Sequence, residues 1–352
     1  TMIKKIYPIV CLIAIAGLVL CTSSASAQQL FRLTQYFQNP MVINPATTGI
    51  EGFMDVKVGY RQQWSGLDGS PETYYVSAHA PLRFNSESTS ILNNSLRISN
   101  PSLYNQFDSD TQYGSKSVKH GLGGYITSDR QGIFAQTSGF ASYASHLSLS
   151  NRLRLALGVS AGVTNLQIDV SGVSVIEPND PTYLAYQNQQ GQTTNFDLNA
   201  GVFLYSDLFY VGYSAARIFQ NNLYSDSDII AQQQLTHFGM LGLRLNLSSA
   251  LLLTPGVYVS YDGVNPVTYD VGARVKLRDI FWAGVSYRNT NTMAGMAGIY
   301  INNTFNVSYS YDYGFSGINN LQAGMHEVTL GLVLFNPRQV SPYLWQTNLS
   351  NL

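Results

Sequence analysis

The stretch from Arg152 to Val163 reads RLRLALGVSAGV, with leucine, valine or alanine at every second position from Leu153 onward. Strict alternation with a period of two indicates a β-strand, and this run is about twice as long as the usual globular strand. A tilted strand that crosses a bilayer needs about 9 to 11 residues with one apolar face. The stretch therefore predicts a transmembrane β-barrel. The alternative is a large soluble β-sandwich, whose strands are nearer about 5 or 6 residues.

The same alternation recurs along the chain. In residues 267–277 and 304–313, apolar or aromatic residues alternate with polar, charged or glycine residues. We predict an all-β, antiparallel transmembrane barrel of about fourteen strands, an even number that suits bacterial single-chain barrels. The predicted strands span 53–64, 72–82, 119–129, 134–149, 152–164, 193–204, 207–216, 233–247, 250–262, 266–277, 280–289, 293–301, 303–313 and 325–335.

The predicted connections fall into two classes. If the N-terminus is periplasmic, the periplasmic connections are tight, at Ser150-Asn151, Tyr205-Ser206, Ser248-Ser249, Arg278-Asp279 and Asn302-Asn303. The long connections then lie outside, at 165–192, 217–232 and 314–324, where we expect external partner contacts. Short periplasmic turns and long external loops are typical of barrels in the outer membrane of Gram-negative bacteria.

One connection breaks this pattern. Residues 83–118 are long, rich in serine and asparagine, and fall on the predicted periplasmic side. They are either a disordered insertion, or two short strands that the pattern does not resolve, or a periplasmic segment that docks a partner. The sequence leaves these alternatives open.

Side chains on the predicted strands indicate where the membrane–water interfaces and the barrel lumen lie. Aromatic residues near strand ends predict interfacial girdles: Trp64, Tyr210, Phe281, Trp282, Tyr311 and Tyr313. Charges of both signs fall on the predicted inner face: Arg152, Arg154, Asp197, Arg244, Asp270, Arg274, Lys276, Arg288, Asp312 and Glu327. Mixed signs favour a cross-linked, plugged or narrow interior over a charge-selective pore.

The two ends of the chain differ from the predicted barrel, residues 53–335. Residues 1–27 have a basic start, an apolar run and an A-x-A site at Ala27, as in a removed signal peptide. Cys21 could instead be the lipid-attachment site of a lipoprotein. Leu20 disfavours this alternative, because the residue before such a cysteine is normally small. Both cysteines lie in this predicted signal. A C-terminal tail, 336–352, runs past the last strand.

A segment without strand pattern, 28–52, precedes the barrel. Its steps Asn39-Pro40 and Asn44-Pro45 favour turns and exclude a continuous strand or helix. The segment is either a flexible leader or, as we favour, an ordered periplasmic or plug-like element. We hypothesise that its residues and the first loop bind a partner: Tyr36, Asn39, Pro40, Asn44, Pro45, Trp64 and Asp68.

No catalytic, cofactor or metal site is predicted. Charged residues are only 11% of the chain against about 25% in globular proteins, and the net charge of −1 gives no case for nucleic acid. The five histidines are scattered, and we expect His79 and His146 to be polar lumen residues rather than ligands or bases. The run Gly121-Leu122-Gly123-Gly124 lacks the lysine and helix of a phosphate loop, so close strand packing explains it better. We therefore expect that the protein is not an enzyme.

Several motifs together resemble the PorP/SprF family of type IX secretion system membrane proteins. They start with QYFQNP at 35–40, INPA at 43–46 and YRQQWSGLDGSPET at 60–73. They continue with SAHAPL at 77–82, GLGG at 121–124, DRQG at 129–132 and HLSL at 146–149. FWAGVSYR at 281–288, YSYDY at 309–313 and GMHEV at 324–328 extend the likeness to the last strand. The chain departs at Thr47-Thr48, where the family pattern has an aromatic and a small residue.

The resemblance implies an outer-membrane barrel that supports secretion and surface anchoring of cargo with a type B C-terminal domain, including gliding adhesins. It also implies periplasmic, peptidoglycan-associated partners of the secretion machine. The sequence leaves a second function open, a porin or transporter for a small or apolar solute.

Overall fold

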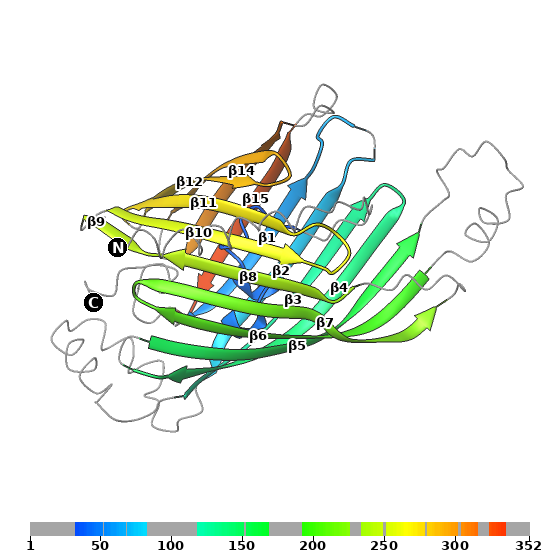
Figure 1. The fold of residues 1–352 in the computed structure, drawn as a ribbon, viewed down its shortest axis with the longest axis horizontal. Helices are drawn as coiled ribbons and strands as arrows, with labels where there is room; N and C mark the ends of the chain where they lie inside the picture. Colours follow the sequence, from blue (N-terminus) through cyan, green and yellow to red (C-terminus); the bar gives the residue numbers. More distant parts are fainter. Residues whose placement is uncertain are drawn as a thin grey trace, which may run out of the picture.

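The computed structural model describes residues 32–51, 53–67, 69–82, 118–150, 153–168, 192–225, 234–248, 251–278, 280–301, 304–315 and 324–335. Neighbouring strands of one antiparallel sheet wind into a barrel, shown as a ribbon in Figure 1. The predicted signal 1–27, the connection 83–117 and the tail 336–352 lie outside the described residues.

In the described ranges, fifteen strands make up the sheet, and fourteen of them form the closed barrel. They are β1 (Met54–Gln62), β2 (Glu72–Leu82), β3 (Val118–Gln131), β4 (Phe134–Ser148), β5 (Leu153–Ile168), β6 (Gln192–Ser206), β7 (Phe209–Ser225), β8 (Thr236–Leu243), β9 (Leu245–Ser248), β10 (Leu251–Tyr261), β11 (Thr268–Leu277), β12 (Phe281–Arg288), β13 (Thr292–Tyr300), β14 (Phe305–Gly314) and β15 (Met325–Leu334). The barrel closes where β1 pairs with β15, with Met54 opposite Leu334. Because pairing is continuous around the barrel, this closure removes the unpaired sheet edge that a membrane would not tolerate.

The predicted barrel is confirmed, with two differences in its strands. The predicted strand 233–247 is divided into β8 and β9 at Arg244, although the Arg244 backbone N–H still bonds to Leu208 O at 2.7 Å, in register with the β7–β8 pairing. Strand β7 continues to Ser225, so the whole described part of the predicted loop 217–232, residues 217–225, is strand. A bulge in β7 hides this extension from a period-two pattern.

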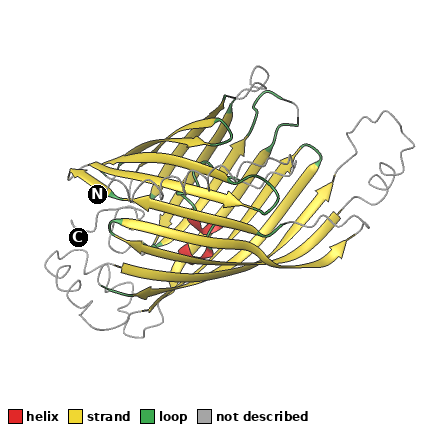
Figure 2. Cartoon of the chain, in the orientation of Figure 1, coloured by secondary structure: helices red, strands yellow, loops and turns green. Residues whose placement is uncertain are grey.

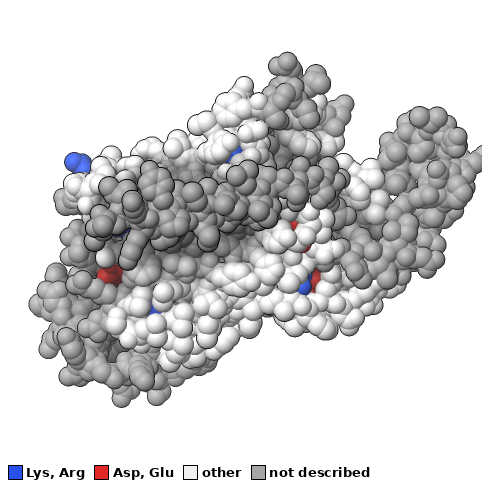
Figure 3. All heavy atoms as spheres, viewed as in Figure 1, with Lys and Arg blue, Asp and Glu red and all other residues white. Residues whose placement is uncertain are grey.

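The barrel is apolar outside and polar inside. On β5, Leu157 and Val159 are 46% and 55% exposed, whereas Ser160 on the opposite face is 3% exposed. Figure 3 shows few charged side chains on the face in view among the described residues. An apolar outer face and a polar lumen are the inverse of a soluble sandwich, so this surface is suited to lipid.

The predicted aromatic girdle needs a correction. Phe281, Tyr311 and Tyr313 are exposed on the outer face, but Tyr210 and Trp282 are 2% and 5% exposed and belong to the buried core cluster. Both inward rings lie over a glycine of a neighbouring strand, Tyr210 over Gly242 and Trp282 over Gly298, as the close approach of ring atoms to each glycine shows. Trp64, in the connection after β1, is half-buried.

Residues 32–51 form what we call the lumen segment, which lies inside the barrel. It contains two short 3-10 helices, η1 (Pro40–Val42) and η2 (Pro45–Thr47), drawn in red in Figure 2. Each begins with proline, whose fixed φ suits the first helical position. The Asn44 side chain caps η2 by accepting from Ala46 N. No helix among the described residues is long and apolar enough to cross a membrane.

Candidate functional site

The lumen segment runs the length of the barrel. The tight connections lie at one end, which we call the tight-turn end, and β3 starts there because Val118 pairs with Leu147 near the β4–β5 turn. At that end, Lys119 Nζ donates to the carbonyl oxygens of Ile50 and Glu51. At the opposite end, the long-connection end, Arg32 Nη2 donates to Thr268 Oγ1 of β11 at 2.8 Å. The segment therefore fills the barrel axis from one rim toward the other.

A buried ion-pair cluster holds the start of the lumen segment. Arg61 on β1 contacts Glu327 on β15 at 2.9 Å and Asp312 on β14 at 3.0 Å. Arg288 on β12 contacts Asp270 at 3.1 Å and Asp312 at 3.7 Å. All five side chains are buried. Charges removed from water need this kind of mutual compensation, so the cluster links β1, β11, β12, β14 and β15 electrostatically.

The lumen segment completes that cluster. The backbone N–H groups of Thr34 and Gln35 donate to the two carboxylate oxygens of Glu327 at 2.8 and 3.1 Å. Thr34 Oγ1 donates to Asp312 Oδ2 at 2.6 Å and accepts from Arg61 Nη1. Hydrogen bonds to charged groups are stronger than neutral ones, so these contacts fix the segment to the wall where β1 and β15 meet.

Asn44 fixes the middle of the segment to the opposite wall. Its side chain is fully buried, and its Nδ2 donates to the carbonyl oxygens of Val202 at 3.1 Å and Tyr213 at 3.3 Å. The neighbouring wall has no room for a side chain at Gly158, because a Cβ there would collide with the backbone of Pro45 and Ala46. Backbone thus lies directly against backbone at this point.

Two histidines bind the end of the segment. His79 Nδ1 accepts from Gly49 N at 3.1 Å, and His146 Nε2 lies 2.9 Å from Thr48 O. Both rings are buried in the lumen, as expected. Gly121 lies against Thr48 and Gly49 so closely that a Cβ would not fit, which confirms close packing rather than a phosphate loop. The histidines therefore hold the segment in place.

The segment also packs aromatic rings against the wall. Tyr36 stacks on Tyr258 with ring centroids 4.7 Å apart, and Phe37 meets Trp282 edge-on at 5.2 Å. The Arg274 guanidinium lies 3.8 Å from the centre of the Phe37 ring. Burial raises the pKa of the Tyr36 hydroxyl above its ordinary value, so this ring is a neutral packing element.

The structure brings together five of the seven residues that we hypothesised to bind a partner. Tyr36 is partly buried and the others are buried, all in the lumen segment: Tyr36, Asn39, Pro40, Asn44 and Pro45. Trp64 lies apart, after β1, and Asp68 lies outside the described residues. A partner could reach the five only if the segment left the lumen.

Sequence reasoning missed what these residues contact. Asp312 and Glu327 were assigned to the lumen, but their ion pairs with Arg61 and their bonds to Thr34 were not foreseen. The available signal was the period-two face assignment, which places Arg61 in phase with the buried Lys57 and Asp55. Within the described ranges, no group of three histidine, cysteine or acidic side chains is close enough to hold a metal ion.

The sequence profile of the family described as "Type IX secretion system membrane protein PorP/SprF" matches residues 25–332. No curated protein matches the chain.

The solved structures to which the chain is similar in fold include the following three proteins. The Ralstonia pickettii toluene transporter TbuX has 9% identity and a TM-score of 0.44, with 83% of this chain and 92% of that chain covered. The Acinetobacter baumannii outer membrane protein Omp33 has 8% identity and a TM-score of 0.43, with 82% and 100% covered. The monoaromatic hydrocarbon channel CymD has 11% identity and a TM-score of 0.46, with 84% and 91% covered.

Proposed function

This chain belongs to the PorP/SprF family of type IX secretion system membrane proteins, and we propose that it supports secretion and surface anchoring of a cargo protein with a type B C-terminal domain. It is a barrel of the outer membrane of a Gram-negative bacterium and is associated with the type IX secretion system. In a gliding organism the proposed cargo includes adhesins.

The observation that best supports this proposal is the occupied lumen. Residues 32–51 are tied to the wall by Glu327, Asn44 and the two buried histidines. Passage of a solute along the axis would require these contacts to break together. An anchoring barrel needs no open lumen, because its partners bind at its rims. The filled interior therefore favours anchoring over the alternative of a porin or transporter for a small or apolar solute.

We propose different partners at the two ends. The cargo binds at the long-connection end, around the connections after β5, β7 and β14. Periplasmic, peptidoglycan-associated components bind at the tight-turn end, where β2 ends at Leu82 and β3 begins at Val118. Membrane lipid covers the apolar outer face.

The proposal includes no catalytic reaction. In the described structure, two histidines bind the lumen segment. The outer three contact tyrosine rings: His120 and His237 stack on Tyr143 and Tyr213, and His326 lies tilted against Tyr309. Phenylalanine or asparagine in place of each outer histidine should leave cargo display unchanged if the proposal holds.

Deletion of the gene tests the function. We expect at least one large secreted protein to be lost from the cell surface and to return when the wild-type gene is restored, as measured by surface labelling and mass spectrometry. Unchanged surface display of every secreted protein would refute the proposal. Conductance of the purified barrel in planar bilayers tests the alternative, because a transporter should pass ions or solute and an anchoring barrel should pass little.

A further inference from the structure

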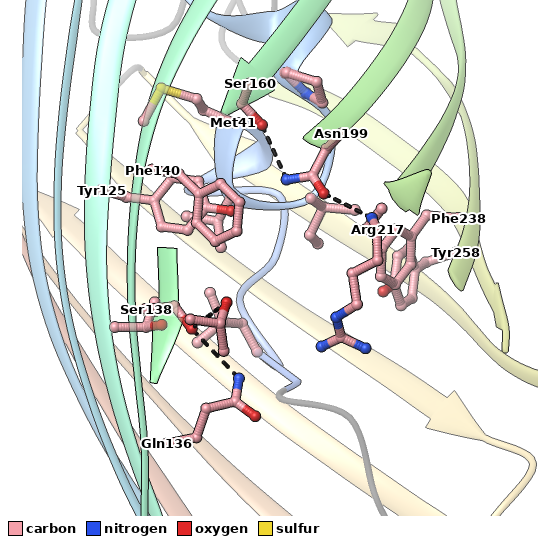
Figure 4. A pocket seen from close by; sticks show the side chains of 17 residues that line it. Met41, Tyr125, Gln136, Ser138, Phe140, Ser160, Asn199, Arg217, Phe238 and Tyr258 are labelled. Carbon is pink, nitrogen blue, oxygen red and sulfur yellow. Dashed lines mark hydrogen bonds between the residues drawn. The ribbon is translucent and has the colours of Figure 1, made fainter. Parts of the chain in front are cut away.

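A bulge in β7 turns one arginine from the lipid face into the lumen. Before the bulge, Val211 and Tyr213 face outward and Ser214 faces inward. Unbroken alternation would place residue 217 on the outer face. The pairing with β6 shifts instead, from Ala200 opposite Ala215 to Leu198 opposite Phe219. Arg217 has a φ of 62°, in the left-handed region that non-glycine residues seldom adopt, and its side chain points inward (Figure 4).

Neighbouring strands hold this bulge in place. The Asn199 Oδ1 atom of β6 accepts from Arg217 N at 2.8 Å, and Asn199 Nδ2 donates to Ser160 Oγ of β5 at 2.9 Å. The Asn199 side chain is largely buried. Three strands therefore fix the direction of the Arg217 side chain, which is what a preformed binding group requires.

Arg217 lines a cavity of about 90 Å³ between the lumen segment and the wall. Two aromatic pairs form its sides. Tyr125 and Phe140 stack with centroids 5.1 Å apart, and Phe238 and Tyr258 stack at 6.1 Å. In Figure 4 the Arg217 side chain runs along the Phe238–Tyr258 pair, and both aromatic pairs line the same cavity. The cavity thus combines flat apolar walls with one cation.

The Arg217 guanidinium is poorly compensated. Among the described residues no carboxylate forms an ion pair with it, and its contact with Gln234 O is long, at 3.5 Å. Asp197 on β6 and Asp262 act on Arg217 electrostatically without forming an ion pair, and the Asp197 Oδ2 atom accepts from Thr164 Oγ1 at 2.6 Å. Among the described residues, the guanidinium thus makes only the long hydrogen bond to Gln234 O, while it lines the cavity.

We propose that this cavity binds a small apolar carboxylate. A guanidinium binds a carboxylate through two parallel hydrogen bonds, and aromatic walls cover a short carbon chain. The volume equals about three water molecules, so it holds the carboxylate and a few carbon atoms. A site for neutral solutes would not need a cation held in a rare backbone conformation. The site goes beyond the anchoring function and does not depend on it.

Ligand-observed NMR on the full chain in neutral detergent tests the site with butyrate and with butyramide, its neutral counterpart. In the wild type we expect butyrate to bind at least about tenfold more tightly than butyramide, as a charge-assisted pair predicts. Arg217→Asn should abolish this difference, because asparagine tolerates a positive φ but carries no charge. Arg278→Asn is the matched control, since Arg278 also has a positive φ, 50°, but lies exposed in the β11–β12 turn.

A second variant acts on the shape of the site. Thr127 lines the cavity from β3, and Thr127→Leu narrows it while Arg217 remains. We expect weaker butyrate binding in this variant, so the test stands even if Arg217→Asn fails to fold. The proposal is overturned if wild type shows no saturable butyrate binding, or if Arg217→Asn binds butyrate as wild type does. Either result would mean that the bulge only keeps a charge out of lipid.

Discussion

Arg61 and Glu327 face each other across the seam that closes the barrel, as register partners on β1 and β15 with a side-chain contact of 2.9 Å. The same carboxylate accepts the backbone N–H groups of Thr34 and Gln35. One buried ion pair therefore joins barrel closure to the lumen segment. Loss of either partner should weaken both.

Glu327→Gln is expected to destabilise the protein by about 3 kcal/mol, since it leaves Arg61 under-compensated in a buried site. A carboxamide also offers one acceptor oxygen where Thr34 and Gln35 now use two. Denaturant unfolding in lipid vesicles measures the change. Glu72→Gln is the control, because Glu72 is only half-buried and bonds to Tyr60 and Tyr74 at 3.2 Å. Equal effects of the two substitutions would contradict the central role of Glu327.

Substitutions at Asn44 should follow a definite order of damage. Asn44→Ala leaves the two carbonyl acceptors without their donor, at a cost of about 1 to 3 kcal/mol. Asn44→Asp should cost more, because it points a carboxylate at those carbonyl oxygens in a buried site. Thermal unfolding of both variants gives the order. If the aspartate variant is as stable as the alanine variant, the Asn44 amide does not bind these carbonyls in the native protein.

Gly158→Ala should make local opening of the lumen segment easier. The added Cβ collides with the backbone of Pro45 and Ala46, so the segment must move or the barrel must distort. We expect amide hydrogen exchange in residues 32–51 to become at least about tenfold faster, as for a local opening made easier by about 1.4 kcal/mol. Gly295→Ala is the control, because a Cβ there meets no atom within 4 Å. Unchanged exchange in Gly158→Ala would argue against tight packing at this point.

The strands could be predicted from the sequence because lipid and lumen impose opposite preferences on alternate residues. The pattern failed at the Arg217 bulge in β7, where alternation is interrupted; Arg244, between β8 and β9, stays in phase and is buried on the inner face. A bulge changes which face a residue occupies, and its position depends on hydrogen bonds from other strands, such as that from Arg217 N to Asn199.

The contacts between the lumen segment and the barrel wall could not be predicted from the sequence, for a different reason. The two Asn-Pro steps indicated an ordered N-terminal segment, and both begin short helices. Its partners, however, are distant in the chain: Thr34 and Glu327 are 293 residues apart. Many polar residues share the inner face, and alternation alone does not say which of them meets the segment. Charge pairing with Arg61 selects Glu327 and Asp312 only once the barrel has closed.

Cysteine labelling tests the predicted direction of the barrel in the membrane. Val264 is 44% exposed in the β10–β11 turn at the long-connection end, and Leu208 is 65% exposed in the β6–β7 turn at the tight-turn end. Val264→Cys should leave its turn intact, because Asp262 bonds the backbone N–H of residue 264 rather than its side chain. In intact cells, a membrane-impermeant maleimide should label Val264→Cys and leave Leu208→Cys unlabelled until the outer membrane is opened. The wild-type chain is the control for background, since both native cysteines lie in the predicted signal peptide. The opposite labelling pattern would show that the barrel has the opposite orientation in the membrane, and the proposed cargo contacts would then belong at the tight-turn end.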